Sequence, residues 1–515
     1  MSFTKPTTRS IITYGAEGVV VDIECHLSNS LPNIVIVGAA SRNVEESRER
    51  IRAAFSTTGL SIPRKRISIN LAPADIPKES SSLDLPIALA IMSASNSLPA
   101  GPTKDDIVIG ELGLDGSVRP VRGIIGKLLS GRKLGYRRFY IPARNLSQAQ
   151  IVPGIDLLPI ENLKQLYEHC MGINELMAIS THDGRIQTPS APHTASLTMT
   201  DIVGQPQAKR AMEIAAAGGH NVLLSGPPGT GKSMLAKALA SLLPPLSHEE
   251  MLEVTHLHSL SGHDYDKLVT ERPVRSPHHS ASHVAIVGGG NAVRPGEVSL
   301  AHRGVLLFDE LPEFGRTTIE ALRQPLEDKT ITISRAKESI EFPANFIFAA
   351  TANPCPCGYY GNRTDNSRLC DCSAAAIQHY KRKLSGPLLD RIDINITVDP
   401  IKHHHLLEPT PDNNNDASII RLVTKARAIQ YERYKNPRKL NSDMSNRDIQ
   451  DYASISAESK DILNLAAKRL DLSARAYMRT IKVARTIADL SQSKDIEVPH
   501  ITEALQYRPQ HLSSA

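Results

Sequence analysis

The sequence predicts a multidomain α/β protein that ends in a helical domain. Short strand-like and helix-like segments alternate up to about residue 175, a strand near residue 225 runs into a glycine-rich loop and a helix, and apolar residues follow a helical spacing after about residue 445. A chain of 515 residues is about two to four times the size of one compact core, so two or three domains are expected. The expected boundaries are an N-terminal domain at 1–175, a linker at 176–200, an α/β core at 201–400, a connecting segment at 401–444 and a helical domain at 445–515.

The composition is that of an ordinary globular protein, with 41% hydrophobic and 22% charged residues, which excludes disorder throughout. The formal net charge of +5 permits nucleic-acid binding without arguing for it. No apolar run reaches the ~18 residues needed to cross a bilayer. Glu17 and Asp22 interrupt the first apolar stretch, which a signal peptide would keep continuous. We therefore expect a cytoplasmic protein with no membrane partner.

The N-terminal segment predicts a mixed α/β domain. The apolar run at 34–37 and the alternation at 67–71 indicate strands, and the amphipathic stretch at 43–55 indicates a helix. Asp115-Gly116 lies between apolar residues and is a hairpin signal. From about residue 176 the composition shifts to Ser, Thr, Pro and His without periodicity, which is typical of a linker.

The core begins with a phosphate-binding loop. The apolar strand at 221–225 runs directly into Gly-Pro-Pro-Gly-Thr-Gly-Lys-Ser, which matches the eight-residue phosphate-loop pattern in full and precedes a run of helix-forming residues. Such a loop turns its backbone N–H groups inward around the phosphates of ATP, while its lysine reaches the β- and γ-phosphates and its hydroxyl ligates Mg²⁺. The residues expected to do this are Gly226, Gly229, Gly231, Lys232 and Ser233.

Two further apolar strands end in polar residues. The run at 304–308 ends in Asp309-Glu310, where we expect Asp309 to hold the magnesium ion and Glu310 to orient and deprotonate the attacking water. Another strand ends at Asn353, whose amide would align the same water. Ligands bind beyond the carboxyl ends of the strands in open α/β sheets, so these residues indicate an ATPase site rather than a solvated strand end.

The order of these motifs resembles that of AAA+ ATPases, and in particular the magnesium-chelatase-related branch. The resemblance rests on Asp-Ile-Val-Gly-Gln at 201–205, Arg-Pro-Val-Arg-Ser-Pro-His-His at 272–279, Gly-Glu-Val-Ser-Leu at 296–300, Asp-Glu-Leu-Pro-Glu at 309–313 and Ser-Gly-Pro-Leu-Leu-Asp-Arg-Ile-Asp at 385–393. Within this branch the chain is most similar to the ComM (YifB) proteins, over nearly its whole length.

The resemblance implies residue roles and an assembly. Ile202 and Val203 would flank the adenine. Arg391 would be the arginine finger that reaches the γ-phosphate of a neighbouring subunit, and Arg475 would be the sensor arginine of a C-terminal helical lid. An arginine supplied by the next subunit implies a ring, and the family expectation is a homo-hexamer.

The same resemblance implies an ATP-driven DNA motor. It would be a branch migration helicase that acts on recombination intermediates during natural transformation, with branched or single-stranded DNA as its partner. A second interpretation is a protein-remodelling or metal-insertion motor like magnesium chelatase, which predicts a protein partner and no stimulation by DNA.

A basic, glycine-rich segment at 262–296 lies between the phosphate-loop helix and the Asp-Glu strand. Its cationic side chains include Arg272 and Arg275, and it also carries the adjacent histidines His278 and His279. A loop of this kind could enter a ring's channel and track a phosphate backbone, or it could be a solvated hairpin, and the sequence favours neither. Adjacent histidines point in different directions on most backbones, which argues against a metal held by both.

Four of the six cysteines form a cluster inside the core, at 355–372. They make two Cys-x-Cys pairs separated by twelve residues, an arrangement that suits a tetrahedral Zn²⁺ site. The spacing within each pair is tighter than usual, so an iron–sulfur group or no metal remain alternatives. The expected ligands are Cys355, Cys357, Cys370 and Cys372.

Two segments of the N-terminal domain, at 77–82 and 110–121, are similar to the proteolytic domain of Lon proteases. Ser82 occupies the place of the Lon nucleophile, but the position that matches the Lon lysine is Ile125, and a Ser-Lys dyad needs that lysine as its base. Lys127 follows two residues later. Two residues of a helix turn about 200°, which predicts that the Lys127 side chain points away from the serine. We therefore expect a Lon-protease-like scaffold without peptidase activity.

Overall fold

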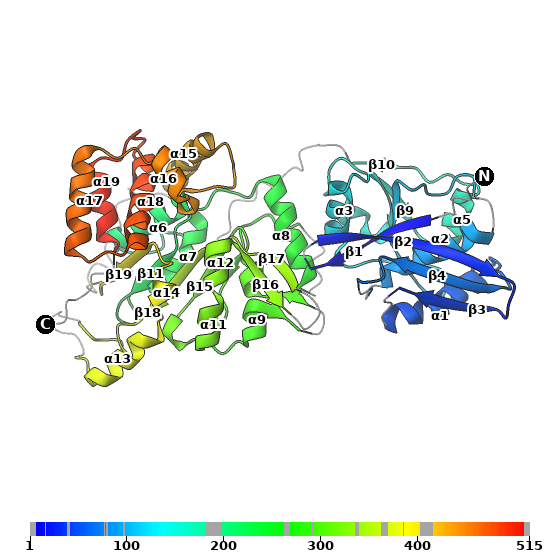
Figure 1. The fold of residues 1–515 in the computed structure, drawn as a ribbon, viewed down its shortest axis with the longest axis horizontal. Helices are drawn as coiled ribbons and strands as arrows, with labels where there is room; N and C mark the ends of the chain where they lie inside the picture. The colour runs from blue at the N-terminus through cyan, green and yellow to red at the C-terminus, as the bar shows by residue number, and fades with distance from the viewer. Residues whose placement is uncertain are drawn as a thin grey trace. The chain divides into compact units, whose positions relative to one another are not determined.

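The chain forms two compact units in a computed structural model (Figure 1). One unit comprises residues 1–190 and 251–269, and the other comprises 191–250 and 270–515. The sequence boundaries did not anticipate that 251–269 groups with the N-terminal unit. The structure describes residues 7–15, 17–38, 42–76, 78, 81–95, 98–181, 197–261, 268–290, 293–334, 339–361, 369–384, 386–401 and 416–508.

The first unit contains two four-stranded sheets and a short hairpin. One sheet has the order β1-β2-β4-β3 and the other β10-β9-β8-β5, while β6 and β7 form the hairpin. The elements are β1 (Thr7–Tyr14), β2 (Glu17–Ser28), β3 (Asn33–Val37), α1 (Arg42–Thr57), β4 (Arg66–Ala72), η1 (Ser81–Leu83), α2 (Asp84–Ser95), β5 (Asp106–Val108), β6 (Glu111–Leu112), β7 (Val118–Arg119), α3 (Ile124–Lys133), β8 (Arg138–Pro142), η2 (Ala143–Asn145), α4 (Leu146–Ala149), β9 (Asp156–Ile160), α5 (Leu163–Cys170) and β10 (Ile179–Ser180).

The local predictions for this unit are confirmed where periodicity was strong. The strands expected at 34–37 and 67–71 and the helix expected at 43–55 are β3, β4 and α1. The hairpin turn also forms, because Leu112 pairs with Val118 across it and Gly116 adopts φ +80°, a left-handed conformation that favours glycine. The linker predicted from residue 176 begins later in the structure. Ile179 pairs with Leu157, so β10 extends the second sheet, and residues 182–196 lie outside the described part.

The second unit is built on a five-stranded parallel sheet of order β12-β15-β18-β11-β19. Its α/β elements are α6 (Pro206–Gly218), β11 (Val222–Ser225), α7 (Lys232–Ala238), η3 (Leu239–Leu242), α8 (His248–Leu260), β12 (Val274–Arg275), α9 (His283–Val287), β13 (Gly288–Gly289), β14 (Arg294–Pro295), α10 (Glu297–Leu300), β15 (Val305–Phe308), η4 (Leu311–Glu313), α11 (Arg316–Ala321), α12 (Arg323–Asp328), β16 (Thr330–Ser334), β17 (Ser339–Pro343), β18 (Ile347–Ala352), α13 (Ala374–Lys383), α14 (Gly386–Leu389) and β19 (Ile394–Thr397). From Met251 onward, α8 groups with the first unit.

A helical region completes the second unit, and it begins earlier than the sequence predicted. Its elements are α15 (Asp416–Tyr434), η6 (Asn441–Asp443), α16 (Asn446–Tyr452), α17 (Ala457–Arg469), α18 (Ala474–Leu490) and α19 (Val498–Gln506). The segment 401–444 was predicted to be a connection between the α/β core and the helical domain. Its described part, from residue 416 onward, instead contains the 19-residue helix α15. That helix buries Ile419, Val423 and Ala426 at helical spacing, but most of its other residues are polar, so its periodicity is weak. No helix among the described residues combines the length and the apolar character needed to span a membrane.

The structure overturns the expected direction of Lys127. Its Nζ lies 3.4 Å from Ser82 Oγ and 3.4 Å from the carbonyl oxygen of Ile11. The prediction was wrong because it assumed that α3 has one buried face. The first residues of α3 are buried on all sides, Ile125 as well as Lys127, so the position opposite Ile125 is also interior. Ser82 and Lys127 are 1% and 2% exposed. The absence of peptidase activity stays a prediction.

Replacing Lys127 with Met should stabilise the protein near neutral pH. Burial lowers the pKa of Lys127 from 10.5 to about 8. Between these two values the unfolded chain binds more protons than the folded chain, so stability rises with pH across that window. Below it, burying the charged form destabilises the fold by about 3 kcal/mol, which Met removes.

Urea unfolding at several pH values measures this difference. The unfolding free energy of the unmodified protein should climb by about 3 kcal/mol more between pH 8 and 10.5 than that of Lys127→Met. Lys133→Met is the matched control, because Lys133 is an exposed lysine on the same helix. Parallel stability curves for all three proteins would show that Lys127 is not a buried cation.

Candidate nucleotide site and cysteine cluster

The candidate nucleotide site lies where three parallel strands end side by side. Leu224 of β11 pairs with Thr351 of β18, and Ala350 of β18 pairs with Phe308 of β15. The phosphate loop, the Asp309-Glu310 pair and Asn353 each follow one of these strands. They therefore meet at the carboxyl edge of the sheet, where open α/β sheets bind ligands.

The phosphate loop folds around the ammonium group of its own lysine. Gly226 adopts φ +154°, and a Cβ there would lie 2.3 Å from the carbonyl oxygen of Val398, so only glycine fits. Lys232 Nζ donates hydrogen bonds to the carbonyl oxygens of Gly226 at 2.8 Å and Pro227 at 2.6 Å. It also lies 3.2 Å from Asn353 Oδ1, so two residues predicted for the site are in direct contact. Burial lowers the pKa of Lys232, although Asp309 and Glu310 oppose the shift.

Asp309 is held by two hydroxyl groups. Ser233 Oγ donates to Asp309 Oδ1 at 2.7 Å, and Thr351 Oγ1 donates to the same oxygen at 2.6 Å. Thr351 Oγ1 also accepts a hydrogen bond from the backbone N–H of Glu310 at 2.9 Å. The pair expected to hold magnesium, Ser233 and Asp309, is thus assembled with oxygens that suit a hard cation.

Sequence reasoning missed Thr351. It is 1% exposed and lies in β18, whose other residues are all apolar, and that single hydroxyl in a buried strand was the available signal. Its neighbour Glu310 has φ +55°, a strained conformation for a non-glycine residue that is common at functional sites. The hydrogen bond that the Glu310 N–H donates to Thr351 Oγ1 holds the Glu310 backbone in that conformation. Thr351 therefore positions both acids.

The two predicted arginines converge on one carboxylate. Arg391 lies 2.7 Å from Glu327 Oε1 and donates to the carbonyl oxygen of Pro387 at 2.6 Å. Arg475 lies 3.6 Å from the same Glu327 oxygen, with 61% of its side chain exposed. Among the described residues, the hydrogen bonds and ion pairs of these arginines do not include Lys232 or Asp309. The structure thus brings the two arginines together on Glu327.

The adenine-flanking residues lie before the phosphate loop in the chain. Ile202 is 5% exposed and packs in the core cluster of the second unit, which includes Met199 and Ala208. Val203 is half-buried. Their expected contact with adenine stays a prediction.

Two cations of the basic segment are already engaged. Arg272 is hydrogen bonded to the carbonyl oxygens of Pro244 and Arg303, and Arg275 makes two contacts of 2.5 and 2.6 Å with Glu297. The rings of His278 and His279 lie with their centroids 4.1 Å apart, closer than the sequence argument implied. Residues 262–267 and 291–292 of this segment are outside the described part.

The four predicted cysteines gather at one point, with all their Sγ atoms within 4.8 Å of one another. Cys355 Sγ lies 3.3 Å from Cys357 Sγ and 3.7 Å from Cys370 Sγ, and Cys357 Sγ lies 3.5 Å from Cys370 Sγ. Four thiolates bound tetrahedrally at ~2.3 Å from one zinc ion would be about 3.8 Å apart. The spacing fits a single tetrahedral ion more closely than a larger iron–sulfur group.

Backbone N–H groups point at these sulfurs, as they do at metal thiolates. The N–H of Tyr360 donates to Cys355 Sγ at 3.3 Å, and the N–H of Tyr359 lowers the pKa of Cys357 to about 7. Gly358, which lies between Cys357 and Tyr359 in the chain, packs on the phosphate loop. A Cβ at Gly358 would lie 2.6 Å from Pro228 Cδ. An ion held by the cysteines would therefore brace the loop that carries Lys232. Residues 362–368 of the insert are outside the described part.

Replacing Thr351 with Val should slow ATP hydrolysis about ten- to hundred-fold, because both acids lose the hydroxyl that positions them. Thr351→Ser keeps the hydroxyl and is expected to retain most of the activity. Steady-state hydrolysis and nucleotide affinity would be measured for both variants. If Thr351→Ser lost as much activity as Thr351→Val, the hydroxyl group would not be what sustains hydrolysis.

Replacing Cys370 with Ser should remove a bound zinc ion, because three thiolates and a hydroxyl hold zinc less well than four thiolates. Elemental analysis of purified protein should find about one zinc per chain before the change and much less after it. Cys170→Ala is the control, since Cys170 is buried in the first unit, outside the cluster. The same zinc content in both variants would exclude the cysteine cluster as the metal site.

The sequence matches three family models that together cover most of the chain. Residues 198–406 match the model described as magnesium chelatase, subunit ChlI, residues 23–145 match subunit ChlI of Mg-chelatase, and residues 413–508 match the ChlI C-terminal region. These matches indicate an AAA+ ATPase that uses ATP and Mg²⁺.

Similar curated proteins extend over almost the whole chain. The competence protein ComM of Haemophilus influenzae is 40% identical over 496 residues, which cover 96% of this chain and 95% of ComM. The protein YifB of Escherichia coli (strain K12) is 39% identical over 510 residues, or 99% of this chain and 97% of YifB. The magnesium-chelatase 67 kDa subunit of Heliobacterium mobile is 24% identical over 271 residues, or 45% of this chain and 38% of that subunit. The chain therefore belongs to the ComM/YifB family of AAA+ proteins related to magnesium chelatase.

Proposed function

We propose that this protein is a cytoplasmic, ATP-driven DNA motor that moves branched recombination intermediates during natural transformation. The observation that carries the proposal is an assembled ATPase site in a chain that is 40% identical to a competence protein over nearly its full length. Competence is the uptake of DNA, and a motor in that process would act on the joints that incoming DNA forms with the chromosome.

The site geometry supports ATP hydrolysis. Lys232 lies at the start of α7, where its side chain can reach the β- and γ-phosphates. Ser233 and Asp309 are hydrogen bonded to each other, as a magnesium-binding pair would be. Glu310, at the end of β15, and Asn353, at the end of β18, flank the position of the attacking water. Phosphoryl transfer depends on positioning and charge stabilisation, which these residues supply together.

The arginine pair supports a ring. Arg391 and Arg475 share Glu327, and among the described residues their hydrogen bonds and ion pairs do not include Lys232 or Asp309. An arginine that stabilises a γ-phosphate must reach one, so Arg391 would serve a neighbouring subunit in a homo-hexamer, with Arg475 as the sensor arginine of the helical lid. Glu327 would then hold both side chains in place until nucleotide competes for them.

The first unit would be a scaffold in this assembly, Lon-protease-like but without peptidase activity. Arg275 is already paired with Glu297 inside the second unit, so the grip on DNA would fall on other cationic groups. His278 and His279 remain exposed on the same segment.

A second candidate is a protein-remodelling or metal-insertion motor with a protein partner. It is favoured by the family models, all three of which describe a magnesium chelatase subunit. The chelatase subunit of Heliobacterium mobile, however, matches only 45% of this chain. This candidate predicts that DNA leaves ATP hydrolysis unchanged.

The deciding experiment is ATP-dependent branch migration of a synthetic four-way DNA junction. The unmodified protein should convert the junction to duplex products, and Lys232→Ala should abolish both conversion and ATP hydrolysis because the phosphates lose their ammonium partner. Lys237→Ala is the control, since Lys237 lies one turn beyond the phosphate-binding start of the same helix.

Three readouts separate the two candidates. Junction conversion by the unmodified protein and Lys237→Ala, but not by Lys232→Ala, would establish the DNA motor. Hydrolysis that DNA does not stimulate, together with an unmoved junction, would support the protein-remodelling candidate and end the recombination proposal.

A further inference from the structure

A cavity of about 370 Å³ lies in the second unit at the opposite edge of the sheet from the phosphate loop. Gly304 and Ile347 line it at the starts of β15 and β18, whereas Asp309 and Asn353 follow the ends of the same strands. Arg303 and Asp309 flank β15 at its two ends, six residues apart, or about 20 Å along a strand. The cavity is therefore separate from the nucleotide site.

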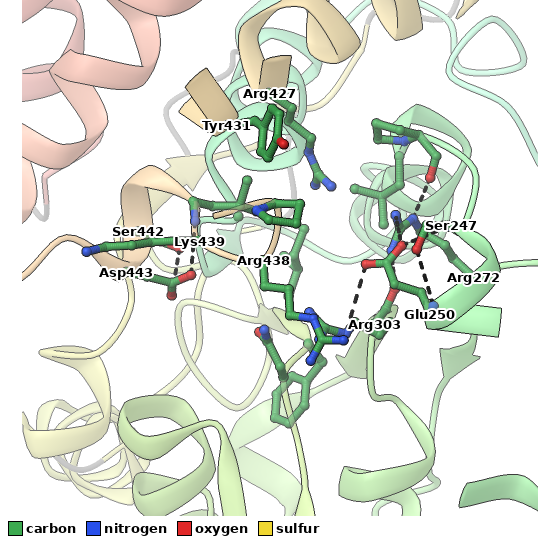
Figure 2. Close-up of a pocket in the computed structure, with 18 of the residues that line it drawn as sticks. Ser247, Glu250, Arg272, Arg303, Arg427, Tyr431, Arg438, Lys439, Ser442 and Asp443 are labelled. Atoms are coloured by element: carbon green, nitrogen blue, oxygen red, sulfur yellow. Dashed lines mark hydrogen bonds and ion pairs between the residues drawn. The ribbon is translucent and has the colours of Figure 1, made fainter. Parts of the chain in front are cut away.

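The cavity is strongly basic. Its lining includes three acids, Glu249, Glu250 and Asp443, and twice as many cations. The cations are Arg272, Arg303, Lys329, Arg427, Arg438 and Lys439. Figure 2 shows Arg427 reaching down from α15 beside Tyr431, while Arg272 and Arg303 approach from other sides of the same space. Charges of one sign in a concave, partly desolvated site focus the field and favour a counter-ion.

The acids are already shared among the surrounding cations. Glu250 lies 3.3 Å from Arg272 and 3.9 Å from Arg303, so one carboxylate serves two guanidinium groups. Glu249 lies 3.4 Å from Arg438, and Asp443 lies 3.4 Å from Lys329. No lining acid is left for Arg427.

Arg427 has no carboxylate within 4 Å in the described part of the chain. Its Nε and one terminal nitrogen donate to the carbonyl oxygen of Ala216, at 3.0 and 2.6 Å. Burial, together with repulsion from Arg272, lowers the pKa of Arg427 to about 9. Burial and the nearby Arg303 also lower the pKa of Arg272, although Glu250 opposes the shift. Arg427 is therefore a buried cation without a carboxylate partner among the described residues, and an anion in the cavity would supply one.

We propose that this cavity binds a phosphate group, carried either by a free nucleotide or by a nucleic-acid backbone. Guanidinium groups bind phosphate oxygens in pairs through a fixed fork of N–H donors, and a cluster of them suits a multiply charged anion. The volume is within the range of small-ligand sites, and the Tyr431 ring beside Arg427 offers a face for a base. The proposal does not depend on the DNA motor function, because the free nucleotide is a sufficient ligand.

Calorimetric titration of inorganic pyrophosphate into Lys232→Ala tests the proposal, since that background weakens binding at the phosphate loop. We expect one pyrophosphate site per chain at matched ionic strength, and about ten-fold or greater weakening on adding Arg427→Gln. Arg438→Gln should weaken binding as well, and because half of its side chain is exposed it leaves the core intact. Arg421→Gln is the matched control, an exposed arginine on the same helix outside the cavity lining.

A second arm measures the affinity of the same variants for single-stranded DNA by fluorescence anisotropy. Weaker pyrophosphate binding with unchanged DNA affinity would assign the site to a small phosphorylated ligand. Weaker DNA binding in Arg427→Gln and Arg438→Gln, but not in Arg421→Gln, would assign it to a nucleic-acid backbone. If both cavity variants bound pyrophosphate and DNA as tightly as the parent, the proposal would be overturned.

Discussion

Parallel pairing of β11, β15 and β18 is the constraint on which the site depends. Their register places Ser225, Phe308 and Ala352 at one edge, so the loops that follow must share the same space. Asp309 receives two hydroxyl donors there, and Glu310 is held through its backbone. A buried threonine thus positions two adjacent carboxylates at the end of one strand.

The same strands separate opposite charges. Acids collect at the carboxyl edge, beside Lys232, whereas Arg272 and Arg303 collect at the amino edge with one shared glutamate. The two edges therefore suit different ligands. The carboxyl edge suits a polyanion bound to a metal ion, and the amino edge suits an anion alone. Two phosphate-binding environments on one sheet would not compete for a ligand, because the strand length keeps them about 20 Å apart.

Sequence patterns predicted what is local and failed where distant segments meet. The phosphate loop, the Asp309-Glu310 pair and the cysteine cluster were predictable because spacing along the chain fixes their chemistry. Thr351 was missed because its role arises only when β18 lies beside β15. Lys127 was placed wrongly because the first residues of α3 are buried on all sides, so that part of the helix has no solvent face from which to infer direction. The helix α15 was missed because its buried stripe is narrow and interrupted by polar residues, including Gln430, which is buried and hydrogen bonded.

The placement of Arg391 depends on the helical region as much as on the sheet. Asp393, two residues later, lies 3.3 Å from His220 Nδ1 and 2.9 Å from Arg479 of α18. Although burial opposes it, His220, Arg479 and Arg508 hold the pKa of Asp393 well below its usual range, so the carboxylate stays charged and its bonds persist. His220 Nε2 in turn lies 2.8 Å from Thr486 on α18. Arg475 belongs to that helix too, so the positions of both arginines depend on α18.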